Sequence, residues 1–208
     1  MNTANLTARI RSLLDEREAG FWSDEEITAA LNEAQTEVIN YALFVFTNGG
    51  LASGLPFVLT PFETEERFTS VTGSEVPLPE DLLYIFEVKC ATSQNGEEKP
   101  VPIWSMSLTR YAREHNSLLK SGAGSMFCHV AGSELVFSSP LNSGSYTIAY
   151  LRKPDEITEV QGSELPENCS GALVAYATAL LLEKDKQHDE SANFFRLYTM
   201  KVEQLAGL

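Results

Sequence analysis

Apolar residues recur at steps of three and four along the stretch 21–46, FWSDEEITAALNEAQTEVINYALFVF, and this period predicts a long amphipathic helix. Ser23 and Glu26 stand three residues apart just before the apolar run, which predicts a capping box at the start of the helix. Asparagine and two glycines at 48–50 predict its end. A helix over 24–47 would be about 36 Å long. Such a helix needs packing partners along most of its length, and we expect the rest of the chain to supply them. Its apolar stripe consists of Ile27, Ala30, Leu31, Ala34, Val38, Ala42 and Val45.

The same helical period returns near both ends of the chain. At the N-terminal end it predicts a helix over 3–16, followed by a short linker in which Phe21 or Trp22 can pack against Ile27 as a hydrophobic staple. Near the C-terminal end a helix is expected to start at Pro166 and to be covered on several sides, because 172–177 is apolar nearly all round. Asp189 is expected to cap a final helix. Its stripe is Ala192, Phe195, Tyr198, Val202 and Leu205.

Between these helices the period changes toward two, which is typical of strands. Strands are predicted at 68–71, 83–91, 101–104, 126–130, 134–138 and 146–152, with turns at 95–96 and 142–144 and a short helix at 107–119. Within the second strand, Phe86, Val88 and Cys90 are expected to share one face. The sequence therefore predicts an α+β fold in which N- and C-terminal helices pack as a helical bundle with an inserted antiparallel β-sheet or barrel. We expect 1–50 and 160–208 to form the helical subdomain and 51–159 the β-rich one.

The segment that follows the long helix, NGGLASGLPFVLTPFETE, combines glycines and prolines with large apolar residues. Two interpretations stay open at this point. The segment is either a loop folded over the core of its own subunit or an arm that packs on a neighbouring subunit. On the second interpretation the subunit-contacting residues are Leu51, Leu55, Phe57, Val58, Leu59 and Phe62.

Charge and cysteine content narrow the classes of partner. The formal net charge is −14, with 29 acidic against 15 basic residues, so a surface that binds nucleic acid specifically is not expected. An acidic wall can still lie beside DNA without holding it, because like charges repel. The start of the chain lacks the apolar core of a signal peptide, and the longest apolar run, 172–182, is too short to span a bilayer. Three widely spaced cysteines indicate free thiols in a reducing compartment.

No residue pattern gives a strong signal for catalysis or for a bound cofactor or metal. Cys128 and His129 are neighbours, but adjacent side chains of a strand point to opposite faces, so Cys128 is interpreted as a core residue. The glycine-rich stretch 121–125 lacks the Lys-Ser or Lys-Thr ending of a phosphate loop and is interpreted as a turn. His188 has no second ligand at metal-site spacing. The many adjacent acid pairs are interpreted as solvated faces, so no catalytic, cofactor-binding or metal-binding residue is assigned and an enzyme is disfavoured.

Taken together, five short motifs resemble a known family. In chain order they are WSDEEI at 22–27, LNEAQ at 31–35, LPEDLL at 78–83, YTIAYLRKP at 146–154 and LPE at 165–167, before an alanine-rich helix. This arrangement is similar to the head-to-tail (neck) adaptor proteins of tailed bacteriophages, the tail tubular protein A-like and related portal adaptors. The resemblance covers nearly the whole chain, and the first two motifs are its most specific part.

The resemblance implies a structural protein that acts as a head-to-tail connector. Such adaptors form a ring, usually twelve-fold, that joins the portal protein to a tail or nozzle protein and lines the channel for double-stranded DNA, without sequence-specific binding. The implied location is the virion neck, after synthesis in the bacterial cytoplasm, with no cofactor and no membrane contact. The implied portal-contacting residues are Lys201, Val202, Glu203, Gln204, Leu205 and Leu208. Two alternatives from other classes are a soluble hydrolase that uses a carboxylate pair and a monomeric β module that binds a small ligand.

Overall fold

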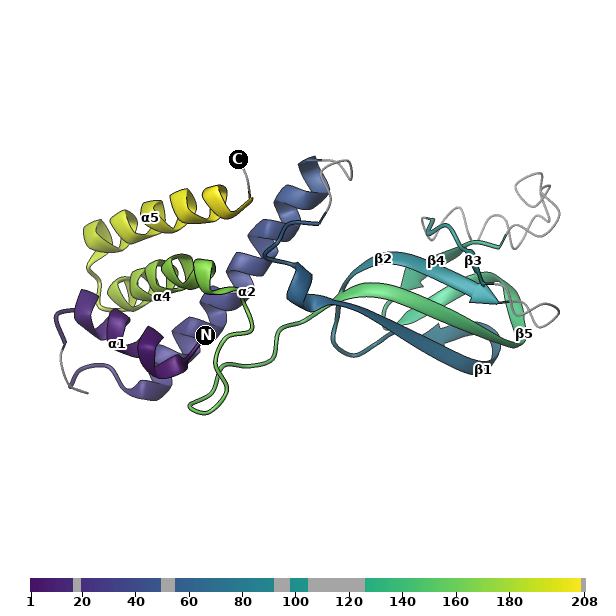
Figure 1. The fold of residues 1–208 in the computed structure, drawn as a ribbon, viewed down its shortest axis with the longest axis horizontal. Helices are drawn as coiled ribbons and strands as arrows, with labels where there is room; N and C mark the ends of the chain where they lie inside the picture. The colour runs from purple at the N-terminus through teal and green to yellow at the C-terminus, as the bar shows by residue number, and fades with distance from the viewer. Residues whose placement is uncertain (17–19, 50–54, 92–97, 105–125, 207–208) are drawn as a thin grey trace. The chain divides into compact units, whose positions relative to one another are not determined.

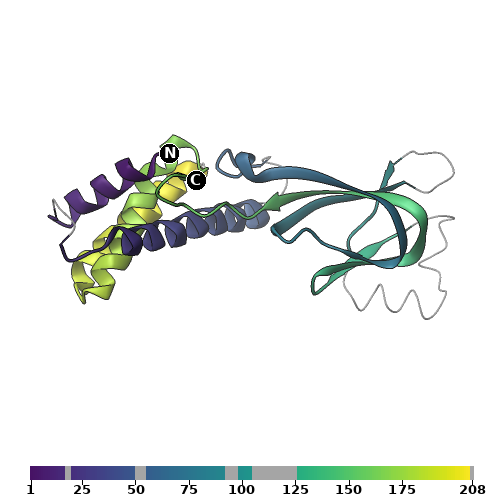
Figure 2. The ribbon, with the colours of Figure 1, turned by 90° about the horizontal axis from the view of Figure 1, so that it is seen from below.

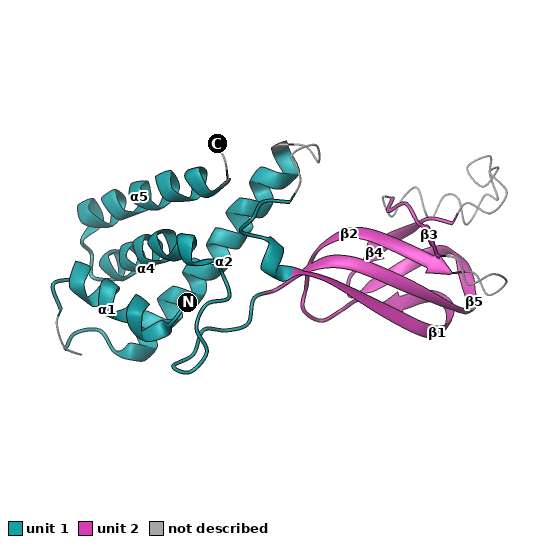
Figure 3. Cartoon of the chain, viewed as in Figure 1, with its two compact units in different colours: residues 1–62, 154–208 teal, residues 63–153 magenta. Residues whose placement is uncertain are grey.

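The computed structural model describes residues 1–16, 20–49, 55–91, 98–104 and 126–206. It divides into two compact units, shown in Figure 3: Met1–Phe62 with Pro154–Leu208, which we call the helical unit, and Glu63–Lys153, which we call the β unit. The predicted α+β fold, with helices from both ends of the chain packed together and antiparallel strands between them, is confirmed. The predicted helix at 107–119 and the predicted turns at 95–96 and 121–125 lie outside the described residues.

The described part of the helical unit contains four α-helices: α1 (Thr3–Leu13), α2 (Asp24–Gly49), α4 (Ser170–Lys184) and α5 (His188–Ala206). Helix α4 contacts each of the other three and lies between α1 and α5 (Figure 1). Nine of its fifteen residues are buried, which is why its sequence is apolar nearly all round. This central position confirms the expectation that the helix is covered on several sides.

Helix α2 begins with the predicted capping box. The Ser23 backbone N–H donates to the Glu26 carboxylate (3.1 Å), and the Glu26 backbone N–H donates to the Ser23 hydroxyl (3.2 Å). Trp22 is buried before the cap, whereas Phe21 is exposed. The helix continues two residues beyond the predicted end at 47, and the Asn48 side-chain amide donates to the Phe44 carbonyl (2.8 Å) in its last turn.

Three predicted helix ends are wrong by a few residues. Helix α1 ends at Leu13 instead of 16, because Asp15 adopts a positive φ of 54°. Pro166 precedes a 3₁₀ turn, η4 (Glu167–Cys169), and α4 begins only after it. Helix α5 begins at His188, so Asp189 lies in its first turn, where its charge suits the helix dipole.

In the residues described, the β unit is a five-stranded antiparallel sheet of β1 (Glu63–Pro77), β2 (Leu82–Ala91), β3 (Glu98–Pro100), β4 (Cys128–Ala131) and β5 (Glu134–Arg152). The strand order is β1-β5-β2-β3, and β4 also pairs with β5. Strands β1 and β5 form one long ribbon that bends (Figures 1 and 2). On the other edge of β5, its second half pairs with β2 and its first four residues pair with β4.

The prediction of two strands separated by a turn at 142–144 is wrong, because a single strand, β5, runs through these residues. The strand continues through this region because the β1–β5 ribbon bends at register shifts, with an extra residue in β1 between Phe68 and Val71 and extra residues in β5 between Val136 and Leu141, instead of at a turn. Ser70 and Gly73 of β1 take positive φ values of 60° and 102° at the bend. Pro140 lies between the paired residues Val136 and Leu141, where the β1–β5 ladder shifts register and needs no proline N–H.

Residues 101–104 do not form the predicted strand. Their backbone instead hydrogen-bonds to both β2 and β4. The Val101 N–H donates to the Val88 carbonyl (2.7 Å), the Cys128 N–H donates to the Pro102 carbonyl (3.0 Å), and the Trp104 N–H donates to the Cys128 carbonyl (2.7 Å). These bonds tie β2 and β4, which pair with different parts of the same edge of β5, to each other. The curled sheet therefore wraps around a core of its own.

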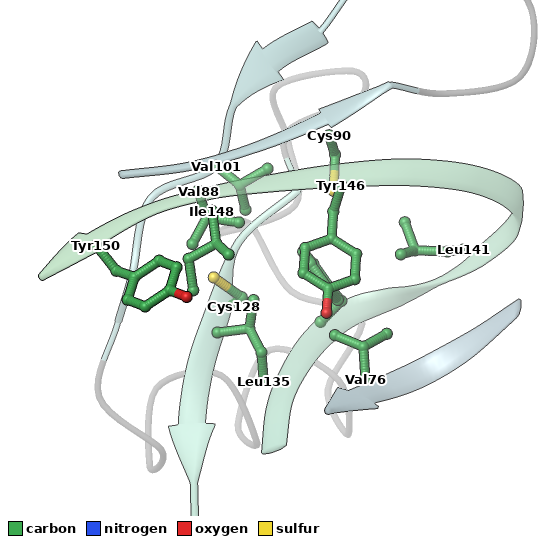
Figure 4. Packing of buried hydrophobic residues seen from close by; sticks show 11 residues of the cluster. Val76, Val88, Cys90, Val101, Cys128, Leu135, Leu141, Tyr146, Ile148 and Tyr150 are labelled. Atoms are coloured by element: carbon green, nitrogen blue, oxygen red, sulfur yellow. The ribbon is translucent and has the colours of Figure 1, made fainter. Parts of the chain in front are cut away.

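The core of the β unit is formed by side chains from every strand except β3, with the ring of Tyr146 among them (Figure 4). A register shift between Ile85 and Glu87 changes the alternation of β2, so Ile85 packs against this core with Val88 and Cys90. The expectation that Phe86 faces the core is therefore wrong, and Phe86 instead packs edge-on against Tyr84. The buried core residues are Val76, Val88, Cys90, Val101, Cys128, Leu135, Phe137, Leu141, Tyr146, Ile148 and Tyr150.

Candidate functional site

Two segments connect the units, and both are bound to the helical unit. We call 55–62 the outgoing linker and 154–165 the return linker. Asn32 of α2 holds the return linker through both atoms of its side-chain amide: its nitrogen donates to the Ile157 carbonyl (3.0 Å), and its oxygen accepts from the Ile157 N–H (2.7 Å). The side chain thus forms the pair of bonds that a neighbouring strand would form with this backbone.

Gln35, one turn further along α2, is 1 % exposed and holds the same linker at two more points. Its amide nitrogen donates to the Asp155 carbonyl (2.9 Å), and its oxygen accepts from the Ser163 hydroxyl (2.6 Å). The Ser163 oxygen in turn accepts from the Leu165 N–H (3.2 Å). We call Asn32, Gln35 and Ser163 the linker clamp. It gives a physical reason for the LNEAQ motif, in which two amides face the protein instead of solvent.

The return linker is also bound by the start of the chain. The Thr3 hydroxyl donates to the Thr158 carbonyl (2.8 Å). A Cβ added to Gly162 would lie 1.6 Å from the Met1 carbonyl oxygen, so only glycine fits there. Between these contacts, Val160 is 97 % exposed at the tip of a turn in which the Thr158 N–H donates to the Gln161 carbonyl.

The outgoing linker places only part of the predicted subunit-contact set on the surface. Val58, Leu59 and Phe62 are buried within the helical unit. Phe57 is 63 % exposed and Leu55 is half-buried. Leu51 lies outside the described residues. The segment thus contributes to the core of its own unit and leaves Phe57 and part of Leu55 for contact with another chain.

The predicted portal-contacting residues lie on the last turns of α5. Val202 is buried, Gln204 is exposed, and the three others described are half-buried. Leu208 lies outside the described residues. Two exposed apolar residues of α5, Leu197 (39 % exposed) and Met200 (58 %), were not singled out from the sequence. The signal was available, because both fall off the inward stripe of this helix.

The inward stripe itself starts one residue earlier than predicted. Ser191 is fully buried, and its hydroxyl donates to the Ala179 carbonyl of α4 (2.9 Å), whereas Ala192 is exposed. Tyr176 of α4 packs edge-on against Phe195 and Tyr198 of α5. These contacts hold the inner face of α5 and leave the face with Leu197 and Met200 open.

An open pocket of about 600 Å³ between α1 and α2 is lined by several carboxylates, among them Glu16 and Asp24. Arg11 is buried there between Glu16 (2.9 Å) and Asp24 (2.7 Å), and it also donates to the Trp22 carbonyl (3.0 Å). The second oxygen of Glu16 accepts the backbone N–H groups of 20–22. Both carboxylates are therefore engaged in fixing the α1–α2 connection.

Burial raises the pKa of Glu16, but its three backbone donors and Arg11 outweigh burial, so its pKa is lowered overall. A hydrolase that uses a carboxylate pair needs one acid with a raised pKa, and Glu16 is shifted in the other direction. The three thiols are free and buried, and burial raises the pKa of Cys128 to about 12, which disfavours a nucleophile. His188 is exposed and pairs with Glu183 (3.0 Å).

No group of three or more His, Cys, Asp or Glu residues is placed to hold a metal ion within the described ranges. No helix in the same ranges combines the length and apolar character needed to cross a bilayer. The features that remain are packing surfaces: the linkers, the open face of α5 and the sheet edge of the β unit.

Comparison with known proteins gives one family. No curated protein matches the chain. The sequence model of the family described as SU10 adaptor protein matches residues 1–207. This match spans the helices, both linkers and the β unit, and it agrees with the resemblance to adaptor proteins drawn from the motifs. The chain belongs to the SU10 adaptor protein family.

Proposed function

We propose that this chain is a structural subunit of a bacteriophage head-to-tail connector, a ring that joins the portal protein to the tail or nozzle protein. The observation that carries the proposal is the match of the adaptor family over residues 1–207. The resemblance to the tail tubular protein A-like group supports the finer assignment to a neck adaptor. The ring would be found in the virion neck after synthesis in the host cytoplasm.

The architecture supports a structural role. The side chains of Asn32, Gln35 and Glu16 in the helical unit bind the chain's own backbone. The interior of the curled sheet is filled by side chains such as Tyr146 and Phe137, both fully buried, which leaves the ligand-binding alternative without a supporting observation.

The open face of α5 is the portal contact in this proposal. Leu197, Met200 and Gln204 follow one another at steps of three and four on the exposed side of the helix. Val202 would support this face from inside, because it is buried under the helix. Apolar side chains exposed on one helix face are typical anchors of a helix-mediated interface.

Phe57 is the leading candidate for contact between ring subunits. A closed ring of identical chains uses two different patches on each subunit, and a large exposed aromatic on a fixed segment suits one of them. The outgoing linker is fixed by Leu59, whose N–H donates to the Pro56 carbonyl (2.8 Å), and by its buried neighbours. Phe57 would therefore pay little conformational entropy on contact.

The net charge of −14 supports a channel that lets DNA pass without binding it. Replacing acids that line the channel by lysine should slow DNA ejection while ring assembly continues. Ejection kinetics are followed by DNA release from purified virions. Unchanged kinetics would argue against a repelling wall.

The experiment that tests the proposal mixes the protein with the portal protein of its own phage and images the mixture by electron microscopy. We expect a ring stacked on the portal. Truncation after Glu203 and the Met200→Glu variant should weaken docking, whereas Thr199→Glu, which places the same charge on a different exposed face of α5, should not. Phe57→Ser should reduce the number of subunits bound per portal. A portal that recruits no protein, or docking that is equal in all variants, would refute the assignment.

A further inference from the structure

Strand β1 has one edge that pairs with no other described strand. Its fifteen residues pair with β5 along one side only, and the described sheet ends at β1. From Glu63, opposite Leu151, to Phe68, opposite Tyr146, the register is continuous, and the shifts begin only after Phe68. This regular stretch is about 20 Å long and carries outward N–H and C=O groups at alternate residues. Such an edge is a template for the addition of another strand.

The charge along this edge is negative on both faces of the sheet. Arg67 donates to the Ser145 hydroxyl (3.3 Å) and Phe68 stacks on Tyr146 of the core, so these two residues mark opposite faces. Glu63 and Glu65 share the face of Arg67, and Glu66 shares the face of Phe68. All three acids are exposed. The charge of Arg67 is already balanced, because its side chain pairs with Glu98 of β3 (3.3 Å).

We propose that the edge of β1 at 63–68 is a strand-addition site for an extended segment of a partner protein that carries lysine or arginine on both of its faces. A strand laid along β1 would place its side chains beside Glu65 on one face and beside Glu66 on the other. Opposite charges in such cross-strand pairs are favourable, and like charges are unfavourable. The three acids therefore favour an incoming strand whose side chains are positively charged.

The same charges exclude a second copy of this chain as the occupant. Two β1 edges paired with each other would bring Glu63, Glu65 and Glu66 of one chain against the same acids of the other. The partner is thus a different and basic polypeptide. This inference does not depend on the adaptor role, since it rests on the β unit alone.

The test uses the full chain and a nine-residue fluorescein-labelled peptide, GKVKKVKVG. A second peptide, GKPKKPKPG, carries the same charge but cannot extend a sheet, because proline lacks the N–H and interrupts the ladder. We expect fluorescence anisotropy to show binding of the valine peptide at least tenfold tighter than that of the proline peptide. Hydrogen exchange by NMR should show new protection at alternate amides of 63–68.

The matched variants separate this edge from the overall charge. Glu63→Lys, Glu65→Lys and Glu66→Lys together should weaken binding of the valine peptide at least tenfold. The control is Glu33→Lys, Glu156→Lys and Glu159→Lys, which alters three exposed acids of the helical unit by the same charge and should change binding by less than twofold. Circular dichroism checks that both triple variants fold. If the first triple variant does not fold, the new hydrogen-exchange protection at 63–68 of the unsubstituted protein still identifies the edge that binds the peptide.

Three results would overturn the proposal. Equal binding of the two peptides would show simple charge attraction without strand pairing. Equal weakening by the two triple variants would show that the position of the acids is irrelevant. A dimer of the protein alone in sedimentation, with protection of 63–68 on dimerisation, would assign the edge to a second copy of the chain.

Discussion

Replacement of Gln35 by alanine tests whether the linker clamp stabilises the helical unit. The variant removes a hydrogen bond to the Asp155 carbonyl and one from the Ser163 hydroxyl, both made by a side chain that is 1 % exposed. Two intramolecular hydrogen bonds contribute about 2 kcal/mol together, and a buried group left without a partner adds to the loss. Asp155 is exposed, so water can reach its carbonyl, whereas Ser163 is buried. We therefore expect a loss of about 2–3 kcal/mol in the free energy of unfolding.

The assay can follow the helical unit by itself. The chain has two tryptophans, Trp22 buried in the helical unit and Trp104 stacked on Phe127 in the β unit (4.3 Å between ring centres). In a Trp104→Phe background, Trp22 emission during urea denaturation reports the helical unit. This separation matters because two units need not unfold in one step.

The neighbouring position supplies the control. Thr36 is exposed, and its hydroxyl donates to the Asn32 carbonyl (3.0 Å) within the same helix, so Thr36→Ala should change stability by less than about 0.5 kcal/mol. A double-mutant cycle of Gln35→Ala with Ser163→Ala should give a coupling energy of about 1 kcal/mol. If the Gln35→Ala midpoint equals that of Thr36→Ala, the clamp does not stabilise the unit and the reasoning is refuted.

Two further predictions concern ionisable groups. The Glu16→Gln variant should be less stable by about 1 kcal/mol at pH 7, because a neutral amide loses the ion pair with Arg11. Folding lowers the pKa of Glu16, so its contribution to the free energy of unfolding is present above the usual carboxyl pKa of about 4.3 and is lost as the pH falls through the folded value. The stabilities of the two proteins, measured from pH 7 to pH 3, should therefore converge. A constant difference across this range would contradict the assignment. The three buried thiols should react with Ellman's reagent at pH 8 within minutes only after denaturation, because burial raises their pKa to about 12, 12 and 11; rapid reaction of the native protein would contradict the packing. They are Cys90, Cys128 and Cys169.

The fold class followed from the sequence because helical stripes and strand alternation are local signals. The capping box at Ser23 and the stripe of α2 were correct for this reason, since both depend on residues within two turns of one another. The prediction of α5 was correct in kind and wrong by one position at its start, where Ser191 is buried through a bond to the Ala179 carbonyl of a different helix. Local period carries no information about that partner.

The β unit was less predictable because its geometry is set by register shifts between strands. A shift in β2 replaces Phe86 by Ile85 in the core, and shifts along β1 and β5 allow one strand to pass through Pro140. Whether a proline ends a strand depends on whether its missing N–H would have had a partner, and that partner lies more than 60 residues away on β1.

The predicted contact residues could also be recognised only in part from the sequence. An apolar segment at 55–62 was recognisable, but the sequence could not tell Phe57, which is exposed, from Phe62, which is fully buried. The amides of the LNEAQ motif were visible as part of a resemblance. Their role in holding residues more than 100 positions further along the chain required the fold.

The insertion of the β unit between two halves of the bundle has a consequence for synthesis. Helices α1 and α2 emerge from the ribosome first, yet the helix that covers them, α4, begins only at Ser170. Meanwhile Glu63–Lys153 emerges as a continuous segment whose strand partners are all its own. We expect the inserted unit to fold during translation, while the core residues Ile10, Ile27 and Leu31 are still exposed to solvent. The incomplete chain therefore exposes this apolar surface during the synthesis of about a hundred further residues. Chaperones should accordingly bind the first half of this polypeptide before α4 is made.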